Sequence, residues 1–430
     1  MRRCFKYRAY PTKAAETRAI EWLDLCRRLY NAALEQRIRA YQERGVSLHE
    51  YTQALELKTL KTDDNFPEYR FVGSQVLKDV LRRLDRAYQA FFRRVKRGDN
   101  APGFPHFKGV GHYNSFTFPN SSGWKLSNRI GESGLPTGDL TLSVKYVGNF
   151  KLRFKRSRPI EGEICTVTVE RTKTAKWFVC FSCKNVASEN IPPTEESIGI
   201  DVGTMVMVAD SRNTRWPRGE FLEKRLRELR ILQRRAARQR ASMKADKRES
   251  SKRLDKTYDE IRQLFESIVN RRSDFINKVA HHYARNYKTI NIENLDIIKL
   301  IRQSKGPFIS AENKKKKYRP PIARLRILDA AWGTFFQQLK QRSESLGHTV
   351  VEKESAYTTM TCSRCGHVQR VNRAFRMFDC QNCGLRINRK VNAARNINGD
   401  VTPYDIGRPG IAGLLEQFRQ ETVERGESDV

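Results

Sequence analysis

The spacing of hydrophobic residues divides the chain into a helical part, a strand-rich part, and a part in which strands and helices alternate. Residues 2–9 alternate as a strand does, and apolar residues then recur at helical spacing over about 12–44 and 74–95. Ser74 suits the N-cap of the second helix. Glycine and proline interrupt the pattern over 98–108, which predicts a joint between two parts of the chain.

Short β-type runs follow over about 112–187, separated by Gly, Pro and Asn turns. They predict an antiparallel barrel or sandwich, which the N-terminal strand can join. From Pro192 and Pro193 onward, strands alternate with helices, which is typical of an α/β layer. In that part we expect strands at 197–203, 205–209, 289–295 and 349–352, and helices at about 219–245, 252–286 and 320–346.

The composition indicates a nucleic-acid-binding protein. The length of 430 residues allows several domains, and 82 Lys and Arg against 48 Asp and Glu give a net charge of +34. This charge is spread along the chain, which favours a nucleic-acid partner over a membrane surface. No apolar run approaches the ~18 residues of a transmembrane helix, and the N-terminus lacks the apolar core of a signal peptide. We therefore exclude an integral membrane protein and a secreted enzyme, and expect a cytoplasmic location.

The nine cysteines fall into two groups. Five have apolar surroundings and are interpreted as reduced structural thiols: Cys4, Cys26, Cys165, Cys180 and Cys183. The other four follow the spacing Cys362-x2-Cys365-x14-Cys380-x2-Cys383, in which two thiolate pairs can surround one zinc ion. Four unrelated thiols, or two disulfides, are the alternative. Because four sulfur ligands leave no position for water, we expect a structural Zn²⁺ and not a catalytic one.

Two carboxylates stand at the ends of apolar strands. Asp201 lies between Gly199 and Gly203, and Glu293 ends the run Ile290-Asn-Ile. Carboxylates at the ends of parallel strands can hold Mg²⁺ for phosphodiester hydrolysis, as in an RNase H-like site. Taken alone, each is also an ordinary strand end.

Several segments, in order along nearly the whole chain, carry a family resemblance. They are Phe5-Lys-Tyr-Arg-Ala-Tyr-Pro-Thr-Lys, Pro102-Gly-Phe-Pro-His-Phe-Lys, Gly199-Ile-Asp-Val-Gly, Ile292-Glu-Asn-Leu, Thr361-Cys-Ser-Arg-Cys-Gly-His and Val391-Asn-Ala-Ala-Arg-Asn-Ile. In identity, order and spacing they resemble TnpB, the transposon-encoded RNA-guided nuclease that is ancestral to the type V CRISPR effectors.

The resemblance implies an α+β multidomain fold with a helical recognition lobe, a β-barrel wedge domain, and an RNase H-like (RuvC) α/β domain with an inserted zinc ribbon. It implies guide RNA and double-stranded target DNA with a short adjacent motif as partners, in a bacterial cytoplasm and at the nucleoid when bound. The expected bounds are 1–12 and 106–190 for the wedge, 13–105 for the recognition lobe, 195–357 and 388–410 for the RuvC-like domain, 358–387 for the ribbon, and 411–430 for a C-terminal tail.

One segment departs from the family pattern. After the ribbon the family has Asp-Arg-Asp-x-Asn-Ala-Ala, whose second Asp is its third metal-binding carboxylate, whereas this chain has Asn388-Arg-Lys390. A Lys about 4 Å from Mg²⁺ is repelled by roughly 8 kcal/mol at an effective dielectric constant of about 20. We therefore expect the Lys390 ammonium to take the place of the metal beside Asp201 and Glu293, with no Mg²⁺ in the RuvC site.

The competing interpretation is that another acid supplies the third carboxylate. Asp296 lies close after Glu293 in the sequence, and Asp400 and Asp405 follow the departing segment. If the helix there continues, Asp400 lies about three turns beyond Lys390. A substitute carboxylate would restore the metal ligands and give an active RNA-guided DNA endonuclease of the TnpB type.

Basic clusters are candidate nucleic-acid contacts. Residues 222–245 hold nine Lys and Arg against two acids, with leucines along one side, so one face can pack while the other follows phosphates. A solvated surface face is the plain alternative. The helix over 74–95 is a candidate for reading the duplex motif, and a basic run at 314–317 lies in an expected loop. The candidate residues are Arg82, Arg83, Arg86, Arg230, Arg234, Arg235, Arg238, Lys314, Lys315, Lys316 and Lys317.

These features together predict an RNA-guided, sequence-specific double-stranded DNA-binding protein that does not cut, similar to the TnpB-like nuclease-dead repressors. A stable complex on a promoter blocks RNA polymerase, so we expect transcriptional repression. Recruitment of RNA polymerase or a sigma factor is a third option, and a decayed transposon remnant is the plainest one. The retained apolar periodicity and the intact cysteine motif argue against simple decay.

Overall fold

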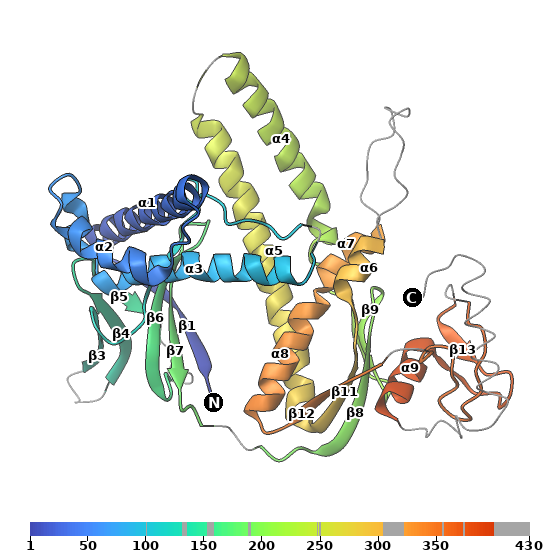
Figure 1. Ribbon diagram of the computed structural model, residues 1–430. Helices are drawn as coiled ribbons and strands as arrows, with labels where there is room; N and C mark the ends of the chain where they lie inside the picture. The colour runs from blue at the N-terminus through green and yellow to red at the C-terminus, as the bar shows by residue number, and fades with distance from the viewer. Residues whose placement is uncertain are drawn as a thin grey trace. The chain divides into compact units, whose positions relative to one another are not determined.

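The computed structural model describes residues 1–99, 101–130, 136–152, 159–187, 191–246, 248, 251–303, 322–354, 357–372 and 375–399. The chain divides into two compact units, Met1–Ala187 and Ser188–Val430, and each is described by itself (Figure 1). None of the helices that the structure describes combines the length and the apolar character needed to cross a membrane.

A seven-stranded antiparallel sheet forms the base of the first unit. Its strands are β1 (Arg3–Pro11), β2 (Ser115–Phe118), β3 (Trp124–Ile130), β4 (Pro136–Val144), β5 (Gly148–Leu152), β6 (Glu163–Arg171) and β7 (Trp177–Lys184). Their order is β2-β6-β7-β1-β5-β4-β3, so the N-terminal strand does join the later ones. Within the described residues β2 and β3 each have one paired neighbour in this order, so the barrel expected for the wedge stays a prediction.

Helices cover one face of this sheet. They are α1 (Lys13–Arg44), α2 (Glu50–Thr62), the 3₁₀ helix η1 (Pro67–Phe71) and α3 (Ser74–Lys96). Alternate residues of β1, namely Phe5, Tyr7 and Ala9, are buried. Trp22 of α1 packs edge-on against Phe116 of β2. Sheet and helices therefore share one continuous core.

The two long helices predicted for this unit are confirmed as α1 and α3. The Thr12 side chain accepts a backbone N–H at the start of α1, whereas Gly73, and not Ser74, is the N-cap of α3. Helix α2 was absent from the predicted elements. It buries only Gln53 and Leu57, so its sequence carries little apolar periodicity.

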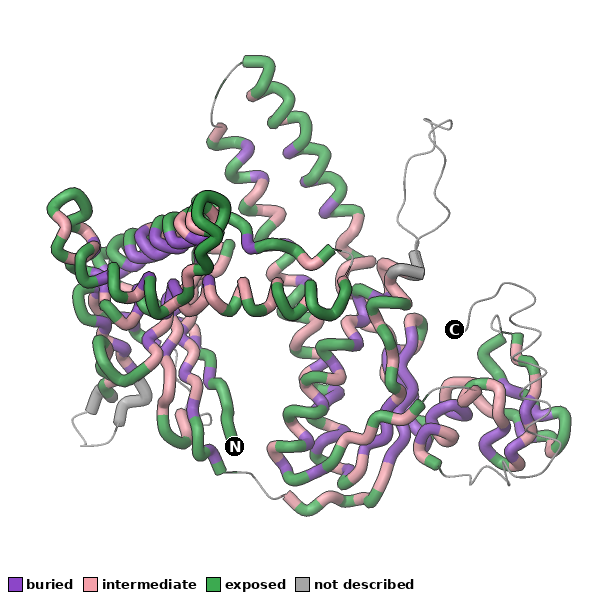
Figure 2. The backbone as a smooth tube through the Cα atoms, viewed as in Figure 1, coloured by how far each residue is buried: buried purple, intermediate pink, exposed green. Residues whose placement is uncertain are grey.

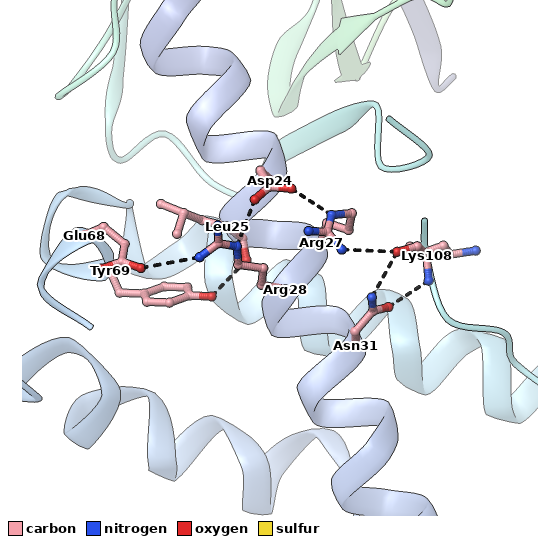
Figure 3. Close-up of polar contacts among 8 residues, drawn as sticks. All are labelled: Asp24, Leu25, Arg27, Arg28, Asn31, Glu68, Tyr69 and Lys108. Carbon is pink, nitrogen blue, oxygen red and sulfur yellow. Dashed lines mark hydrogen bonds and ion pairs between the residues drawn. The ribbon is translucent and has the colours of Figure 1, made fainter. Parts of the chain in front are cut away.

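The segment predicted as a joint is held against α1 (Figure 3). Asn31 Nδ2 donates to the Lys108 carbonyl at 2.9 Å, and the Lys108 N–H donates back to Asn31 Oδ1 at 2.7 Å. Arg27, which pairs with Asp24 at 2.7 Å, donates to the same carbonyl at 3.4 Å. The joint therefore lies inside the first unit and does not separate two cores.

A mixed five-stranded sheet organises the second unit. Its strands are β8 (Glu195–Val202), β9 (Val206–Asp210), β10 (Arg215–Pro217), β11 (Tyr287–Glu293) and β12 (Thr349–Lys353), in the order β10-β9-β8-β11-β12. β11 is parallel to both β8 and β12, whereas β9 and β10 are antiparallel additions. The central strands are buried (Figure 2), and the predicted α/β layer is confirmed.

Long helices pack on this sheet and extend beyond it (Figure 1). The second half of α5 (Lys252–Asn286) and α8 (Trp332–Ser345) contribute Tyr283 and Phe335 to the core. The first half of α5 pairs with α4 (Leu226–Ala245), which follows the 3₁₀ helix η2 (Glu223–Arg225), and the two form a helical arm with a small core of its own. The sheet and helix elements that remain are α6 (Ile297–Gln303), α7 (Ile322–Ala330), β13 (Met377–Asp379), β14 (Arg386–Asn388) and α9 (Arg389–Asn398).

The single helix predicted over 320–346 is interrupted. Ala331 adopts a left-handed backbone conformation with φ of 49° and separates α7 from α8. The turn re-aims the chain so that Trp332, Phe335 and Leu339 of α8 are buried in the core. The turn falls at Ala331 and not at the nearby Gly333, so the sequence pattern did not reveal it.

Candidate functional site

Two acidic residues lie where neighbouring parallel strands end in the second unit. β8 and β11 pair with Gly199 opposite Asn291. Asp201 and Glu293 follow two residues later on each strand, so both lie on the same face of the sheet as that pair. Neighbouring strands are about 5 Å apart, so the two residues are neighbours across the pair of strands. The sequence-based expectation that these two positions share one edge is therefore supported by the register.

Helix α9 lies on that face of the sheet. A methyl group built at Gly199 would overlap the Ala394 carbonyl oxygen and lie 2.6 Å from the Asn398 nitrogen, so only glycine allows the helix this close. Asn291 Nδ2 donates to Asn398 Oδ1 at 3.0 Å. Lys390, Ala394 and Asn398 recur every four residues and so share the helix face that meets the strands. The helix therefore delivers Lys390 to the strand ends.

Lys390 forms an ion pair with Asp201. Its Nζ donates to Asp201 Oδ2 at 2.8 Å and to the Val202 carbonyl oxygen at 2.8 Å. The Asp201 side chain is only 6% exposed and that of Lys390 is 25% exposed. Burial raises the pKa of Asp201, and the adjacent ammonium opposes that rise. A methyl group at Gly203 would overlap the lysine stem and lie 2.6 Å from Nζ, so this glycine makes room for the ammonium.

Of the other acids considered for this site, the structure describes only Asp296. Asp296 Oδ1 accepts the backbone N–H of Lys299 at 2.9 Å, which places it at the start of α6. Among the residues that the structure describes, no third acid or histidine completes a metal-binding set with the strand-end carboxylates. Asp400 and Asp405 lie outside those residues. The pairing of Lys390 with Glu293 stays a prediction.

The four cysteines of the spaced motif form one cluster. Their sulfur atoms all lie within 4.8 Å of one another. Cys362 and Cys383 are 3.7 Å apart at Sγ, and Cys365 and Cys380 are 3.6 Å apart. A tetrahedral zinc ion with Zn–S bonds of about 2.3 Å needs sulfurs about 3.8 Å apart, so the cluster fits zinc. Disulfides need about 2 Å, so the alternative of two disulfides does not fit.

Comparison with protein families agrees with this organisation. Residues 166–303 match the family described as "Probable transposase", residues 332–397 match "Cas12f1-like, TNB domain", and residues 1–46 match "Helix-turn-helix domain". In the structure, that last segment is one strand followed by one long helix.

Similar proteins extend over almost the whole chain. The putative RNA-guided DNA endonuclease InsQ of Escherichia coli (strain K12) is 27% identical over 91% of this chain and 90% of its own length. A putative RNA-guided DNA endonuclease of Streptomyces pristinaespiralis is 28% identical over 92% of this chain and 89% of its own length. The TnpB-like protein L79 of Acanthamoeba polyphaga mimivirus is 26% identical over 34% of this chain and 26% of its own length.

Together these matches support a TnpB-family protein.

Solved structures extend this family relationship to the fold. A Cas12f1–sgRNA–target DNA complex contains a chain with a TM-score of 0.53 and 14% identity, covering 93% of this chain and 98% of that one. The mini-RNA-guided endonuclease CRISPR-Cas_phi3 gives a TM-score of 0.51 and 11% identity, covering 92% of each chain. At these identities the likeness concerns the fold alone. The multidomain α+β prediction is confirmed at that level.

The basic arm presents most of its arginines outward. Leu229 and Leu232 of α4 are buried against α5. Arg235 pairs with Glu260 of α5 at 3.0 Å, which fixes one arginine beside the partner helix. The exposed candidates on α4 are Arg230, Arg234, Arg235 and Arg238. The second basic group, Lys314–Lys317, lies outside the described residues.

The three arginines predicted on α3 differ in their surroundings. Arg83 donates to Asp79 at 2.7 Å, to the Ser115 carbonyl at 2.8 Å and to Thr117 Oγ1 at 2.6 Å, and thereby joins α3 to β2. Its guanidinium is occupied by internal contacts, so Arg83 leaves the set of candidate nucleic-acid contacts. Arg82 pairs with Glu50 at 3.3 Å and Arg86 is exposed.

A further basic surface escaped the sequence-based reasoning. Lys6 and Arg8 lie on the face of β1 opposite its buried residues, and both approach the Phe178 ring of β7, at 4.7 and 5.2 Å from its centroid. Lys6 Nζ also forms an ion pair with Glu170 at 2.6 Å. Tyr10 continues this row and is 48% exposed. Cations and rings on one open sheet face can hold phosphates and stack on bases. The alternation of apolar and basic residues over 2–9 is the signal that could have identified this surface.

Proposed function

We propose that this chain is an RNA-guided, sequence-specific double-stranded DNA-binding protein whose RuvC-like site does not cut DNA. The observation that supports this most directly is the Lys390 ammonium, 2.8 Å from Asp201 Oδ2. Two-metal hydrolysis needs carboxylates that are free to hold divalent cations between them. Here one carboxylate is neutralised by a covalently attached cation that cannot dissociate.

Electrostatics make this arrangement resistant to magnesium. A divalent cation that binds beside Asp201 must displace the Lys390 ammonium. If the ammonium stays close, the two positive charges repel each other. At about 4 Å this repulsion is roughly 8 kcal/mol for a divalent ion at an effective dielectric constant of about 20. Gly203 leaves the space that the lysine uses. Asp201 and Glu293 are thus proposed to be remnants of a nuclease site.

The rest of the molecule retains the properties of a nucleic-acid-binding protein. The net charge of +34 remains, and exposed arginines line α4 of the helical arm. The face of β1 that carries Lys6 and Arg8 is a proposed contact for guide RNA. The four-cysteine cluster is proposed to hold a structural Zn²⁺, which would crosslink the two knuckles and supply no reactive water. Base pairing with the guide would supply sequence specificity, while the protein would hold the duplex by its backbone.

Stable binding without cutting suits repression of transcription. A protein that opens and occupies promoter DNA excludes RNA polymerase from that site by occupancy alone. This role would place the protein in the cytoplasm, at the nucleoid when bound. Direct contact with RNA polymerase or a sigma factor is not required by this proposal.

The test is guide-dependent DNA binding by the purified ribonucleoprotein. RNA that copurifies with the chain is sequenced to define the guide, and binding is then measured on matched and scrambled duplexes at two salt concentrations. We expect tight binding to the matched duplex only, weakening steeply with salt because phosphate contacts release counterions. Equal binding to both duplexes would show that the guide does not direct recognition, and would refute the proposal.

An active RNA-guided DNA endonuclease is the second candidate function. It is favoured by the position of Asp201 and Glu293 at one edge of the sheet, and by relatives whose names describe them as putative RNA-guided DNA endonucleases. It requires a third carboxylate to reach the site and Lys390 to leave it. The same samples therefore serve to test for cut DNA.

A further inference from the structure

Helix α9 is clamped between the sheet and the cysteine cluster. One side of the helix, with Lys390 and Ala394, faces β8 and the strand-end carboxylates. The other side carries Asn392 and Asn396, which are one helical turn apart. Both of these side chains reach the first cysteine knuckle. The helix that presents Lys390 therefore also contacts the backbone of the proposed zinc site.

The side-chain amide of Asn392 forms hydrogen bonds to the residues on either side of one of the four cysteines. Its Oδ1 accepts the Ser363 N–H at 2.8 Å and its Nδ2 donates to the Thr361 carbonyl at 2.7 Å. Cys362 lies between these two residues in the chain. Asn392 is fully buried, with 0% exposure, so water cannot replace either bond. Both polar ends of this side chain are satisfied only while the knuckle keeps its shape.

Asn396 adds a second amide to the same contact. Its Nδ2 donates to the Thr358 carbonyl at 2.7 Å and to the Thr361 carbonyl at 2.8 Å. The Thr361 carbonyl therefore accepts from both asparagines. Two side-chain contacts one turn apart fix the rotation of a rigid helix about its own axis. That rotation determines the direction in which the Lys390 side chain points.

We propose that Asn392 is a positioning residue through which the four-cysteine cluster keeps Lys390 on Asp201. Metal binding crosslinks the knuckle around Cys362, and the knuckle in turn satisfies the buried amide. When the knuckle loosens, the amide loses both partners, and α9 shifts or frays to regain hydrogen bonds. Lys390 then leaves its carboxylate. Whether the cysteine cluster is well ordered thus determines whether Lys390 stays paired with Asp201 and keeps the strand-end site closed.

This inference rests on the proposed function only in taking the Asp201–Lys390 pair as the closed form of the nuclease site. The contacts that link Asn392 to the knuckle and Lys390 to Asp201 are independent of any nucleic acid. A measurement on the protein alone therefore separates the two proposals. DNA cleavage by the ribonucleoprotein would overturn the proposed function and leave the coupling untouched.

The test measures the reactivity of Lys390 toward a lysine-acylating reagent, quantified by mass spectrometry of the full-length chain after digestion. The compared samples are zinc-containing wild type, the same protein after treatment with a chelator, and Asn392→Ala with its zinc content measured. We expect Lys390 to react about tenfold faster in the last two samples, because losing the bonds of one buried amide has about this effect on a local equilibrium. Lys340, which pairs with Glu352 across α8 and β12, is the internal reference.

Asn382→Ala is the matched control. This asparagine also lies at the cluster, with Nδ2 3.5 Å from Cys365 Sγ, but it is exposed and sits on the other knuckle. Its substitution should leave Lys390 protected. Unchanged Lys390 reactivity in a zinc-containing Asn392→Ala protein overturns the proposal. If that variant does not fold, Asn396→Ala and the chelated wild type decide, and protection of Lys390 in both overturns it equally.

Discussion

Removing the Lys390 ammonium while keeping its stem is the sharpest perturbation of the site. Lys390→Met retains the hydrocarbon length but leaves the Asp201 carboxylate without its counter-ion and the Val202 carbonyl without one donor. The carboxylate is only 6% exposed, so water cannot take over this role. We expect the strand end and the start of α9 to open more easily.

The magnitude follows from the geometry of the pair. At 2.8 Å and an effective dielectric constant of about 20, the attraction is roughly 6 kcal/mol, and much of it offsets the cost of desolvating the two ions. Removing one partner of a buried pair costs about 3–5 kcal/mol. Lys390 is 25% exposed, so we take the lower end, about 3 kcal/mol. Asp201→Asn should cost less because it leaves a neutral amide, and the double variant should recover part of the loss.

Hydrogen exchange followed by mass spectrometry measures this locally, which matters because a chain of two units need not unfold in one step. Amides of β8 and of the first turn of α9 should exchange about 100-fold faster in Lys390→Met than in wild type. Amides of β1 and β7, in the other unit, serve as the control and should not change. A change smaller than about threefold at β8 would show that the ion pair does not hold the site closed.

Four further predictions concern the strand-end site, the cysteine cluster and the β1 face. Gly203→Ala should displace the Lys390 side chain, because the added methyl group would overlap it. The acylation rate of Lys390 should then rise about as much as expected when its ion pair with Asp201 is lost. Cys362→Ser should abolish stoichiometric zinc and lower the thermal midpoint by several degrees, as read by metal analysis and calorimetry, whereas retained zinc would contradict the four-sulfur site. The double variant Asn388→Asp with Lys390→Asp should gain a Mn²⁺ signal in electron paramagnetic resonance that wild type lacks. Arg8→Glu should weaken guide-RNA binding at least tenfold at low salt, and an unchanged affinity would remove the β1 face from the account.

Local patterns predicted most of the elements, because helices and strands repeat with short periods. The helix over 12–44 and the cysteine motif depend only on neighbours within a turn or a knuckle, and both appear in the structure as expected. The contact of Lys390 with Asp201 spans 189 residues. It was anticipated because the family motif fixes which position faces the strand ends.

Features that depend on distant packing were not predictable in this way. The strand pattern could not show that helices of the same unit share one core with the first sheet. Arg83 was grouped with its neighbours on α3 because helical spacing cannot show that β2 supplies acceptors for one of them. The left-handed backbone conformation of Ala331 depends on the burial of Trp332 in the core and not on the alanine side chain itself.

Cleavage of matched plasmid DNA tests the central claim most directly. Wild type and the Asn388→Asp, Lys390→Asp double variant are each assembled with the copurifying guide RNA and incubated with the matched plasmid and Mg²⁺, and Asp201→Asn is run alongside. The account predicts that wild type leaves the plasmid supercoiled while still retarding it on a gel. A nick or a double-strand break at the matched sequence by wild type, lost in Asp201→Asn, would contradict it.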